Sequence, residues 1–159
     1  MTATGGSDEK LAIAKQYGAD HLVNYSKEKI RDRVKEITGG TGADVIYDPV
    51  GGDAFDESLR CINWDGRLLV IGFASGRIPE AKANLVLLKS CQIVGVFWGA
   101  YAARDPKAAR GAFEKVLNWA AEGKLKPHIS HTFPLDKVPE AMKTLLARKV
   151  VGKAVIKVR

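Results

Sequence analysis

The loop Thr4-Gly5-Gly6-Ser7 brings together residues that could bind a phosphate group. Ser7 has a hydroxyl, the helix expected after it has free N–H groups, and Lys10 lies one turn into that helix. A dinucleotide site that prefers an unphosphorylated ribose has an acidic residue at the end of its second strand, whereas here the first carboxylates, Asp8 and Glu9, lie inside the helix. The loop therefore favours a phosphate monoester. A plain helix cap at Ser7 and a solvated Lys10 are equally compatible with the sequence.

Two further loops carry glycines between an expected strand and the segment after it. They are Asp48-Pro49-Val50-Gly51-Gly52 and Gly72-Phe73-Ala74-Ser75-Gly76. A glycine lets a ligand approach the backbone closely, and two such loops side by side favour a binding crevice, although one alone is often a plain turn. The aromatic residues Phe97, Trp98 and Tyr101 could stack on a ring, form a subunit contact or pack in the core.

Other catalytic arrangements find little support in the sequence. His21, His128 and His131 include no H-E-x-x-H pair, and there is no G-x-S-x-G motif and no P-loop lysine. Cys61 and Cys91 have no further Cys or His nearby at the spacing of metal ligands. We therefore expect buried, unreactive thiols, no bound metal and no catalytic side chain in this chain.

The composition excludes several classes of protein. With 159 residues, 46% hydrophobic and 27% charged, the chain is neither disordered nor a collagen nor a disulfide scaffold. No apolar run approaches the roughly 18 residues of a membrane span, and the first six residues do not resemble a signal peptide, which predicts a cytoplasmic protein. A net charge of +7 could attract nucleic acid, a membrane surface or a phosphorylated small molecule. Because the basic residues are scattered, we expect a solvated surface and neither a nucleic-acid nor a membrane partner.

Apolar periodicity predicts helices and strands in alternation. A strand is expected to end at Thr4, and others are expected at residues 21–25, 45–48, 67–72, 92–98, 132–133 and 154–158. Helices are expected from Ser7 to Gly18, after a cap at Ser26, around Phe55 and Leu59, at 85–88, from Asp105-Pro106 to Gly123, and at 136–148. The last two should bury apolar stripes, formed by Phe113, Val116, Leu117 and Ala120 and by Val138, Met142, Leu145 and Leu146.

This order predicts an α/β fold, a doubly wound parallel sheet with helices on both faces. In such sheets, ligands bind at the carboxyl ends of the strands, where the three loops above are expected to lie.

Several motifs, taken together and in this order, resemble one known superfamily. They are Ser7-Asp8-Glu9-Lys10-Leu11, Gly18-Ala19-Asp20 leading to Val23-Asn24-Tyr25, Asp48-Pro49-Val50-Gly51-Gly52, Gly66-Arg67-Leu68-Leu69-Val70-Ile71-Gly72 and Gly152-Lys153-Ala154-Val155. The chain resembles the medium-chain dehydrogenase/reductase superfamily, and within it the zinc-independent quinone oxidoreductases that include zeta-crystallin. The resemblance implies a reductase that transfers hydride from NADPH to a quinone or an activated alkene.

The resemblance also implies roles for particular residues. Residues that match Ser7, Lys10 and Tyr25 face the 2′-phosphate of the adenosine. The nicotinamide half is lined by residues that match Val50, Ile71, Gly72, Phe73, Val96, Phe97 and Trp98.

The sequence departs from this superfamily at its start. Members have a catalytic domain, a first strand and a glycine-rich A-x-x-G-V-G turn before the segment that corresponds to Thr4, and none of these precedes Thr4 here. Residues 1–130 are therefore expected to form a partial dinucleotide-binding domain, and 131–159 a segment that returns to the catalytic domain. The sheet should be open between the strand ending at Thr4 and the strand at Val45, unless the strand order is rearranged or a partner chain completes it. We expect the chain alone to be inactive and to form a homodimer or a larger oligomer.

Three alternatives stay open on the sequence. The chain could belong to an enoyl-type reductase of the same superfamily, or serve as a non-catalytic binding or assembly module that uses Phe97-Trp98 and open strand edges. A nucleic-acid-binding function is disfavoured, because no aromatic platform is interleaved with the basic residues.

Overall fold

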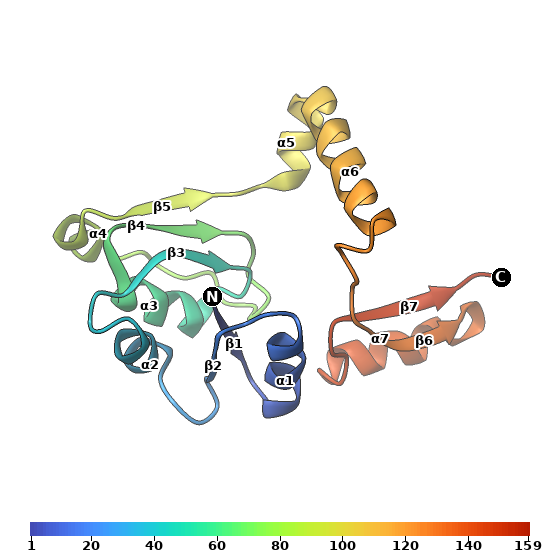
Figure 1. The fold of residues 1–159 in the computed structure, drawn as a ribbon, viewed down its shortest axis with the longest axis horizontal. Helices are drawn as coiled ribbons and strands as arrows, with labels where there is room; N and C mark the ends of the chain where they lie inside the picture. Colours follow the sequence, from blue (N-terminus) through green and yellow to red (C-terminus); the bar gives the residue numbers. More distant parts are fainter. The chain divides into compact units, whose positions relative to one another are not determined.

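The computed structural model describes all 159 residues, which form two compact units, 1–98 and 99–159. Figure 1 shows their helices and strands in chain order. The first unit contains β1 (Thr2–Gly5), α1 (Asp8–Gln16), β2 (His21–Asn24), α2 (Ile30–Ile37), β3 (Ala43–Asp48), α3 (Gly52–Cys61), β4 (Ile62–Val70), α4 (Ala83–Lys89) and β5 (Gln92–Gly95). From the boundary onward follow α5 (Trp98–Arg104), α6 (Pro106–Ala121), β6 (Ile129–Pro134), a 3-10 turn (Leu135–Lys137), α7 (Val138–Leu146) and β7 (Lys153–Lys157).

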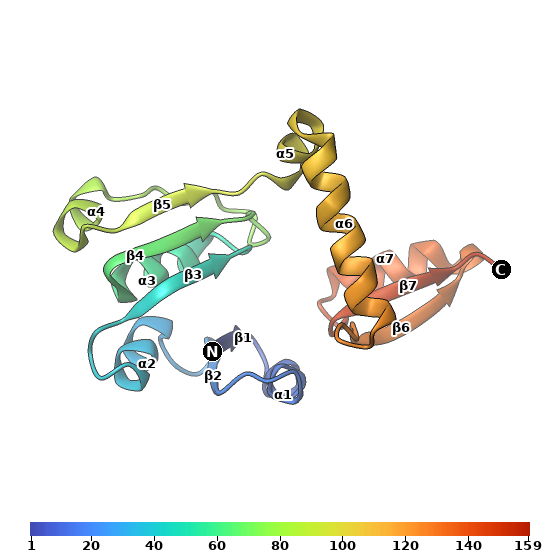
Figure 2. The same ribbon diagram turned by 45° about the horizontal axis from the view of Figure 1, so that its top comes forward.

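Every strand pair in the first unit is parallel, as the alternation of helices and strands predicts. β1 pairs with β2, and β4 lies between β3 and β5 (Figure 2). No strand pairs with the second edge of β1 or of β3. The structure thus has the interruption that the sequence predicts, between the strand ending near Thr4 and the strand containing Val45.

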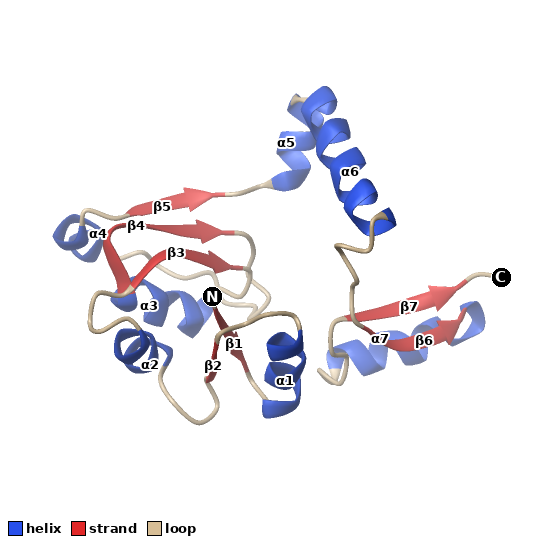
Figure 3. Ribbon diagram, in the orientation of Figure 1, coloured by secondary structure: helices blue, strands red, loops and turns tan.

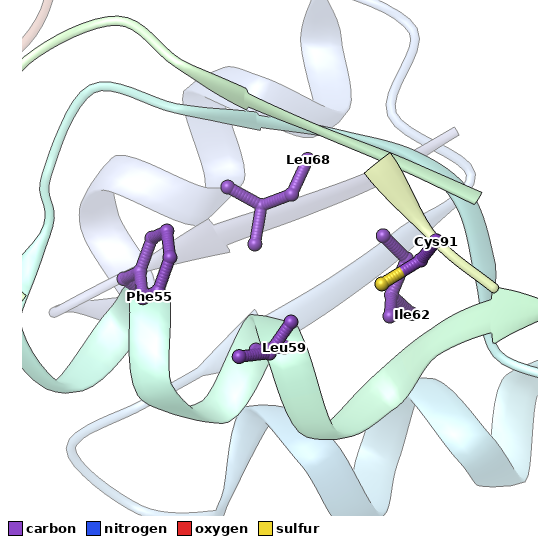
Figure 4. Close-up of a cluster of buried hydrophobic side chains, with 5 residues drawn as sticks. All are labelled: Phe55, Leu59, Ile62, Leu68 and Cys91. Carbon is purple, nitrogen blue, oxygen red and sulfur yellow. The ribbon is translucent and has the colours of Figure 1, made fainter. Parts of the chain in front are cut away.

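Two clusters of buried side chains hold the first unit together. In one, Phe55 and Leu59 of α3 pack against Ile62 and Leu68 of β4 and against Cys91, which precedes β5 (Figure 4). The other joins β2 to α2 and α3 through Val23, Ile30, Val34 and Cys61, with Ile46 of β3 packed against it. Both cysteines are buried and unpaired, as expected, and burial raises the pKa of the Cys61 thiol to about 11.

The opposite face of the β3–β5 sheet carries exposed apolar side chains. Tyr47 is 67% exposed, and Val45, on the same face of β3, is 59% exposed. The register aligns Tyr47 with Leu69 and Leu69 with Val94, which places these three side chains on this face. Helices on both faces of the sheet were expected, and within the first unit α3 and α4 pack on the β3–β5 sheet.

We expect this apolar face to cause self-association, because a bare sheet face and an unpaired strand edge are more stable against another chain than in water. Light scattering at micromolar concentration should give a mass above the 17.2 kDa of one chain. Introducing lysines at Val45 and Tyr47 should lower this mass, whereas Leu87→Lys, at an exposed position on α4, should not. A monodisperse particle of the single-chain mass would contradict the prediction.

The second unit pairs β6 with β7 in parallel, and α7 packs on both strands (Figure 3). Asp105 caps α6, accepting a hydrogen bond from the Ala108 N–H at 2.9 Å, as the Asp-Pro signal predicts. The apolar stripes expected to be buried on α6 and α7 are largely exposed, including Phe113, Val116, Leu117, Met142, Leu145 and Leu146. Periodicity identifies the apolar face of a helix, but how far that face is buried depends on residues distant in sequence.

Two expected element ends are also wrong. Ser26 does not cap α2, which begins at Ile30 after Lys29 without a side-chain cap. The Ser26 hydroxyl donates instead to the carbonyl oxygen of Gly6 at 2.9 Å. The strand expected at 92–98 ends at Gly95, and Trp98 begins α5.

No helix has both the length and the apolar composition to cross a lipid bilayer.

Candidate functional site

The ends of β1 and β2 bring together the three residues expected to face a phosphate. Ser7 is the N-cap of α1, and its hydroxyl oxygen accepts a hydrogen bond from the Lys10 N–H at 3.4 Å. Tyr25 directly follows β2, with its ring against Gly6. A Cβ at Gly6 would lie 2.9 Å from the Tyr25 hydroxyl oxygen, so a side chain at Gly6 would displace this ring. The structure thus brings Gly6, Ser7 and Tyr25 into one corner, with Lys10 in the first turn of α1.

Hydrogen bonds between the loop after β1 and the loop after β2 fix this corner. The Tyr25 N–H donates to the Gly5 carbonyl at 3.1 Å, next to the bond from Ser26 to Gly6. The Asn24 side chain is buried, and its Oδ1 accepts from the Ser26 N–H at 3.0 Å. Sequence analysis missed Asn24, although an asparagine at the end of a strand often bonds to the backbone two residues on.

Asp8 is the negative charge closest in sequence to Ser7 in this corner, and both of its carboxylate oxygens are hydrogen-bonded. Oδ1 accepts from Asn24 Nδ2 at 2.6 Å, and Oδ2 from the Lys27 ammonium. The hydrogen bonds from Lys27 and Asn24 lower the pKa of Asp8, so the carboxylate stays ionised at neutral pH.

A second corner lies at the ends of β3 and β4. Asp48 is 4% exposed, and its Oδ1 accepts hydrogen bonds from the Val50 and Gly51 N–H groups at 2.8 and 3.0 Å. These bonds hold the turn in which Gly51 has a φ of +68°, a conformation that favours glycine. The second oxygen, Asp48 Oδ2, is buried without a hydrogen-bond partner. Sequence analysis missed this role, although Asp before Pro and Gly is a typical turn signal.

The loops after β3 and β4 are joined backbone to backbone. The Ala74 N–H donates to the Pro49 carbonyl at 3.1 Å, and the Ser75 N–H to the Val50 carbonyl at 2.9 Å. The Gly52 N–H in turn donates to the Arg77 carbonyl at 3.1 Å. We call these two joined segments, residues 48–52 and 73–77, the paired loops.

Arg77 adds ion pairs to the paired loops, because its guanidinium contacts Asp53 and Asp56 on α3. The packing leaves no space for larger residues at the glycines. A Cβ at Gly51 would lie 2.9 Å from the Phe73 ring, and one at Gly52 would lie 2.7 Å from the Ser75 hydroxyl oxygen.

The other residues expected around a nicotinamide lie at the ends of β3, β4 and β5. Their positions follow from backbone hydrogen bonds that continue the pairing of β3 with β4 and of β4 with β5. The Ile71 N–H donates to the Asp48 carbonyl at 2.9 Å, and the Val96 N–H donates to the Val70 carbonyl at 2.9 Å. Phe97 is 78% exposed, and Phe73 and Trp98 are also exposed, so none of these rings is packed as a core residue. The expected residues therefore form two groups, Ser7, Lys10 and Tyr25 at the β1–β2 corner, and Val50, Ile71, Gly72, Phe73, Val96, Phe97 and Trp98 at the ends of β3–β5.

Both groups suit parts of a phosphorylated dinucleotide. The β1–β2 corner has a hydroxyl and a helix N-terminus beside a glycine, with a lysine in the first turn of that helix, and these are groups that bind phosphate. At the ends of β3–β5 the backbone at Gly72 and Gly95 has no close side-chain neighbour, and aromatic rings are exposed there, which suits a flat ring. These groups are of the kinds that bind and orient a ligand, and no residue among them is placed as an acid or a base.

The structure contains no group of three His, Cys, Asp or Glu side chains that could hold a metal ion. We expect the purified protein to contain well under one zinc per chain by elemental analysis, because zinc sites in proteins use three or four such ligands. Stoichiometric zinc that survives dialysis against a chelator would contradict this prediction.

The parallel strands, the α-helices that connect them and the loops at the strand ends define a Rossmann-like nucleotide-binding fold. The profile of the zinc-binding dehydrogenase family matches residues 1–122. The chain belongs to this family, within the medium-chain dehydrogenase/reductases, and the resemblance inferred from its motifs is confirmed.

Individual relatives are similar along nearly the whole chain. A quinone oxidoreductase-like protein 2 homolog of Nematostella vectensis is 48% identical over 149 residues, which are 93% of this chain and 41% of the relative. Among solved structures, a quinone oxidoreductase of Pseudomonas syringae pv. Tomato has a TM-score of 0.86 at 30% identity, covering 98% of this chain and 48% of its own. The Escherichia coli quinone oxidoreductase complexed with NADPH also has a TM-score of 0.86, at 27% identity, covering 98% and 49%. The chain thus spans less than half the length of these proteins.

Proposed function

We propose that this chain is the NADPH-binding part of an oxidoreductase that transfers hydride to a quinone or an activated alkene. The observation that carries the proposal is the β1–β2 corner, where Tyr25 lies against Gly6, Ser7 caps α1 through the Lys10 N–H, and the nearest carboxylate is already paired. Similarity to a quinone oxidoreductase complexed with NADPH supports the same cofactor.

Each group of residues has a part in this function. Lys10 supplies the positive charge for the 2′-phosphate, Ser7 a hydroxyl, and Tyr25 an aromatic ring with a hydroxyl beside Gly6. Val50, Ile71, Gly72, Phe73 and Val96 to Trp98 line the nicotinamide half, and the paired loops keep the backbone there in place. The cofactor, when bound, supplies the hydride, and the protein supplies position and electrostatics.

Titration calorimetry with NADPH and NADH tests the binding part of the proposal on the chain itself. We expect NADPH to bind more tightly, because only NADPH has the phosphate that the β1–β2 corner suits. Equal affinity for both, or tighter binding of NADH, would contradict the proposal. Substrate profiling of the full-length protein, with NADPH oxidation as the readout, would separate a quinone reductase from an enoyl-type reductase.

We expect no reductase turnover from the 159-residue chain alone. Its residues would hold NADPH over only part of its length, and none of them is assigned to orient the acceptor. NADPH oxidation with a simple quinone should therefore stay at the uncatalysed rate. Turnover above that rate would show that the acceptor site lies within this chain.

The cytoplasmic location and the dimeric or larger assembly stay predictions.

A non-catalytic assembly module is the second candidate, because Phe97 and the Val45–Tyr47 face of β3 are exposed as a subunit contact would require. Cofactor affinity distinguishes the two functions. An assembly module would associate without binding NADPH.

A further inference from the structure

Asp8 has a position that works against the proposed ligand. It is the first residue of α1, between Ser7 and Lys10, the two residues assigned to the 2′-phosphate. A carboxylate here would repel that phosphate. Because its pKa is lowered, Asp8 carries this charge at neutral pH.

The structure also shows what opposes this charge. Lys27, in the loop after β2, pairs with Asp8 Oδ2, while Asn24 Nδ2 donates to Oδ1. Asn24 is itself buried and bonded to the Ser26 N–H, so the partner of Oδ1 is fixed in place. Both carboxylate oxygens are therefore directed to the β2 loop, and the pair has no net charge.

We propose that Lys27 is a specificity-determining residue, which makes this corner selective for a 2′-phosphorylated nucleotide by neutralising Asp8. Lys27 acts through Asp8 and does not itself contact the phosphate. Without Lys27, the free carboxylate oxygen would repel a 2′-phosphate and leave an unphosphorylated ribose unaffected. This inference rests on the proposed function, because it requires that the corner bind the phosphorylated ribose.

Two probes that differ only in the 2′-phosphate, 2′,5′-ADP and 5′-AMP, test the inference by titration calorimetry on the 159-residue chain. Lys27→Met should weaken binding of 2′,5′-ADP about fivefold to tenfold and of 5′-AMP less than about twofold, since like charges a few ångströms apart at a protein surface interact on this scale. The double variant Asp8→Asn with Lys27→Met should return the affinity for 2′,5′-ADP to within about twofold of the unmodified chain. Lys29→Met is the matched control, because it removes the same charge two residues away and should leave both affinities within about twofold.

The outcomes separate this inference from the proposed function. If the unmodified chain does not bind 2′,5′-ADP more tightly than 5′-AMP, the proposed NADPH preference fails, and the inference fails with it. If the unmodified chain discriminates but Lys27→Met discriminates equally well, or changes no more than Lys29→Met, the inference alone is wrong. If Lys27→Met loses discrimination and the Asp8→Asn change does not restore it, Lys27 acts on the phosphate directly, which also overturns the inference.

Discussion

Replacing Lys10 by Glu in the full-length enzyme should raise the Michaelis constant for NADPH about tenfold to hundredfold more than that for NADH. The substitution removes a charge-assisted hydrogen bond to the 2′-phosphate, which contributes about 1.5–3 kcal/mol. NADH lacks this phosphate and should be little affected. Steady-state kinetics with each cofactor in turn measures the ratio.

Lys15→Glu is the matched control for this experiment, because it reverses the same charge in the last turn of the same helix, where the lysine bonds to the Asp20 carbonyl. It should change the two constants alike. Equal effects of Lys10→Glu on NADPH and NADH would show that the β1–β2 corner does not bind the phosphate.

Replacing Leu68 by Ala should lower the free energy of unfolding by about 2–5 kcal/mol, because the side chain is fully buried and its loss leaves a cavity. Leu68 lies on the central strand of the β3–β5 sheet, packed with Phe55 and Leu59 of α3 (Figure 4). Urea unfolding followed by circular dichroism measures the change.

Leu87→Ala makes the same chemical change on α4, where the side chain is 79% exposed, and should shift the stability by less than about 0.5 kcal/mol. Similar losses for the two variants would mean that the cluster around Leu68 is not the core of the first unit.

Local signals predicted most elements of this fold. Ser7 and Asp105 were identified as helix caps, and the structure shows both side chains accepting a backbone N–H. The β4 strand, apolar on both faces in sequence, is central and parallel as expected. Such features are predictable because they depend on residues a few positions apart.

Features that depend on distant residues were not predicted. Ser26 precedes a helix and has the side chain of a cap, yet it bonds to Gly6, twenty residues earlier in the sequence. Phe113 and Leu117 have the spacing of a buried stripe and are exposed, because burial depends on which distant residues a helix packs against and not on spacing alone. In the candidate site, residue types indicated where a ligand could contact the backbone. They did not indicate that Asn24, Asp48 and Lys27 hold those contacts in place.

The paired loops constrain how this protein can be altered by insertion or by grafting. Residues 48–52 and 73–77 are bonded in register at Pro49, Val50 and Gly52, so one extra residue in either loop would misalign the donors and acceptors of both. A designer who wishes to change the shape of this end of the sheet would have to exchange the two loops as one cassette. Chimaeras that take one loop from a relative and keep the other should lose the register unless both parents share the same loop lengths.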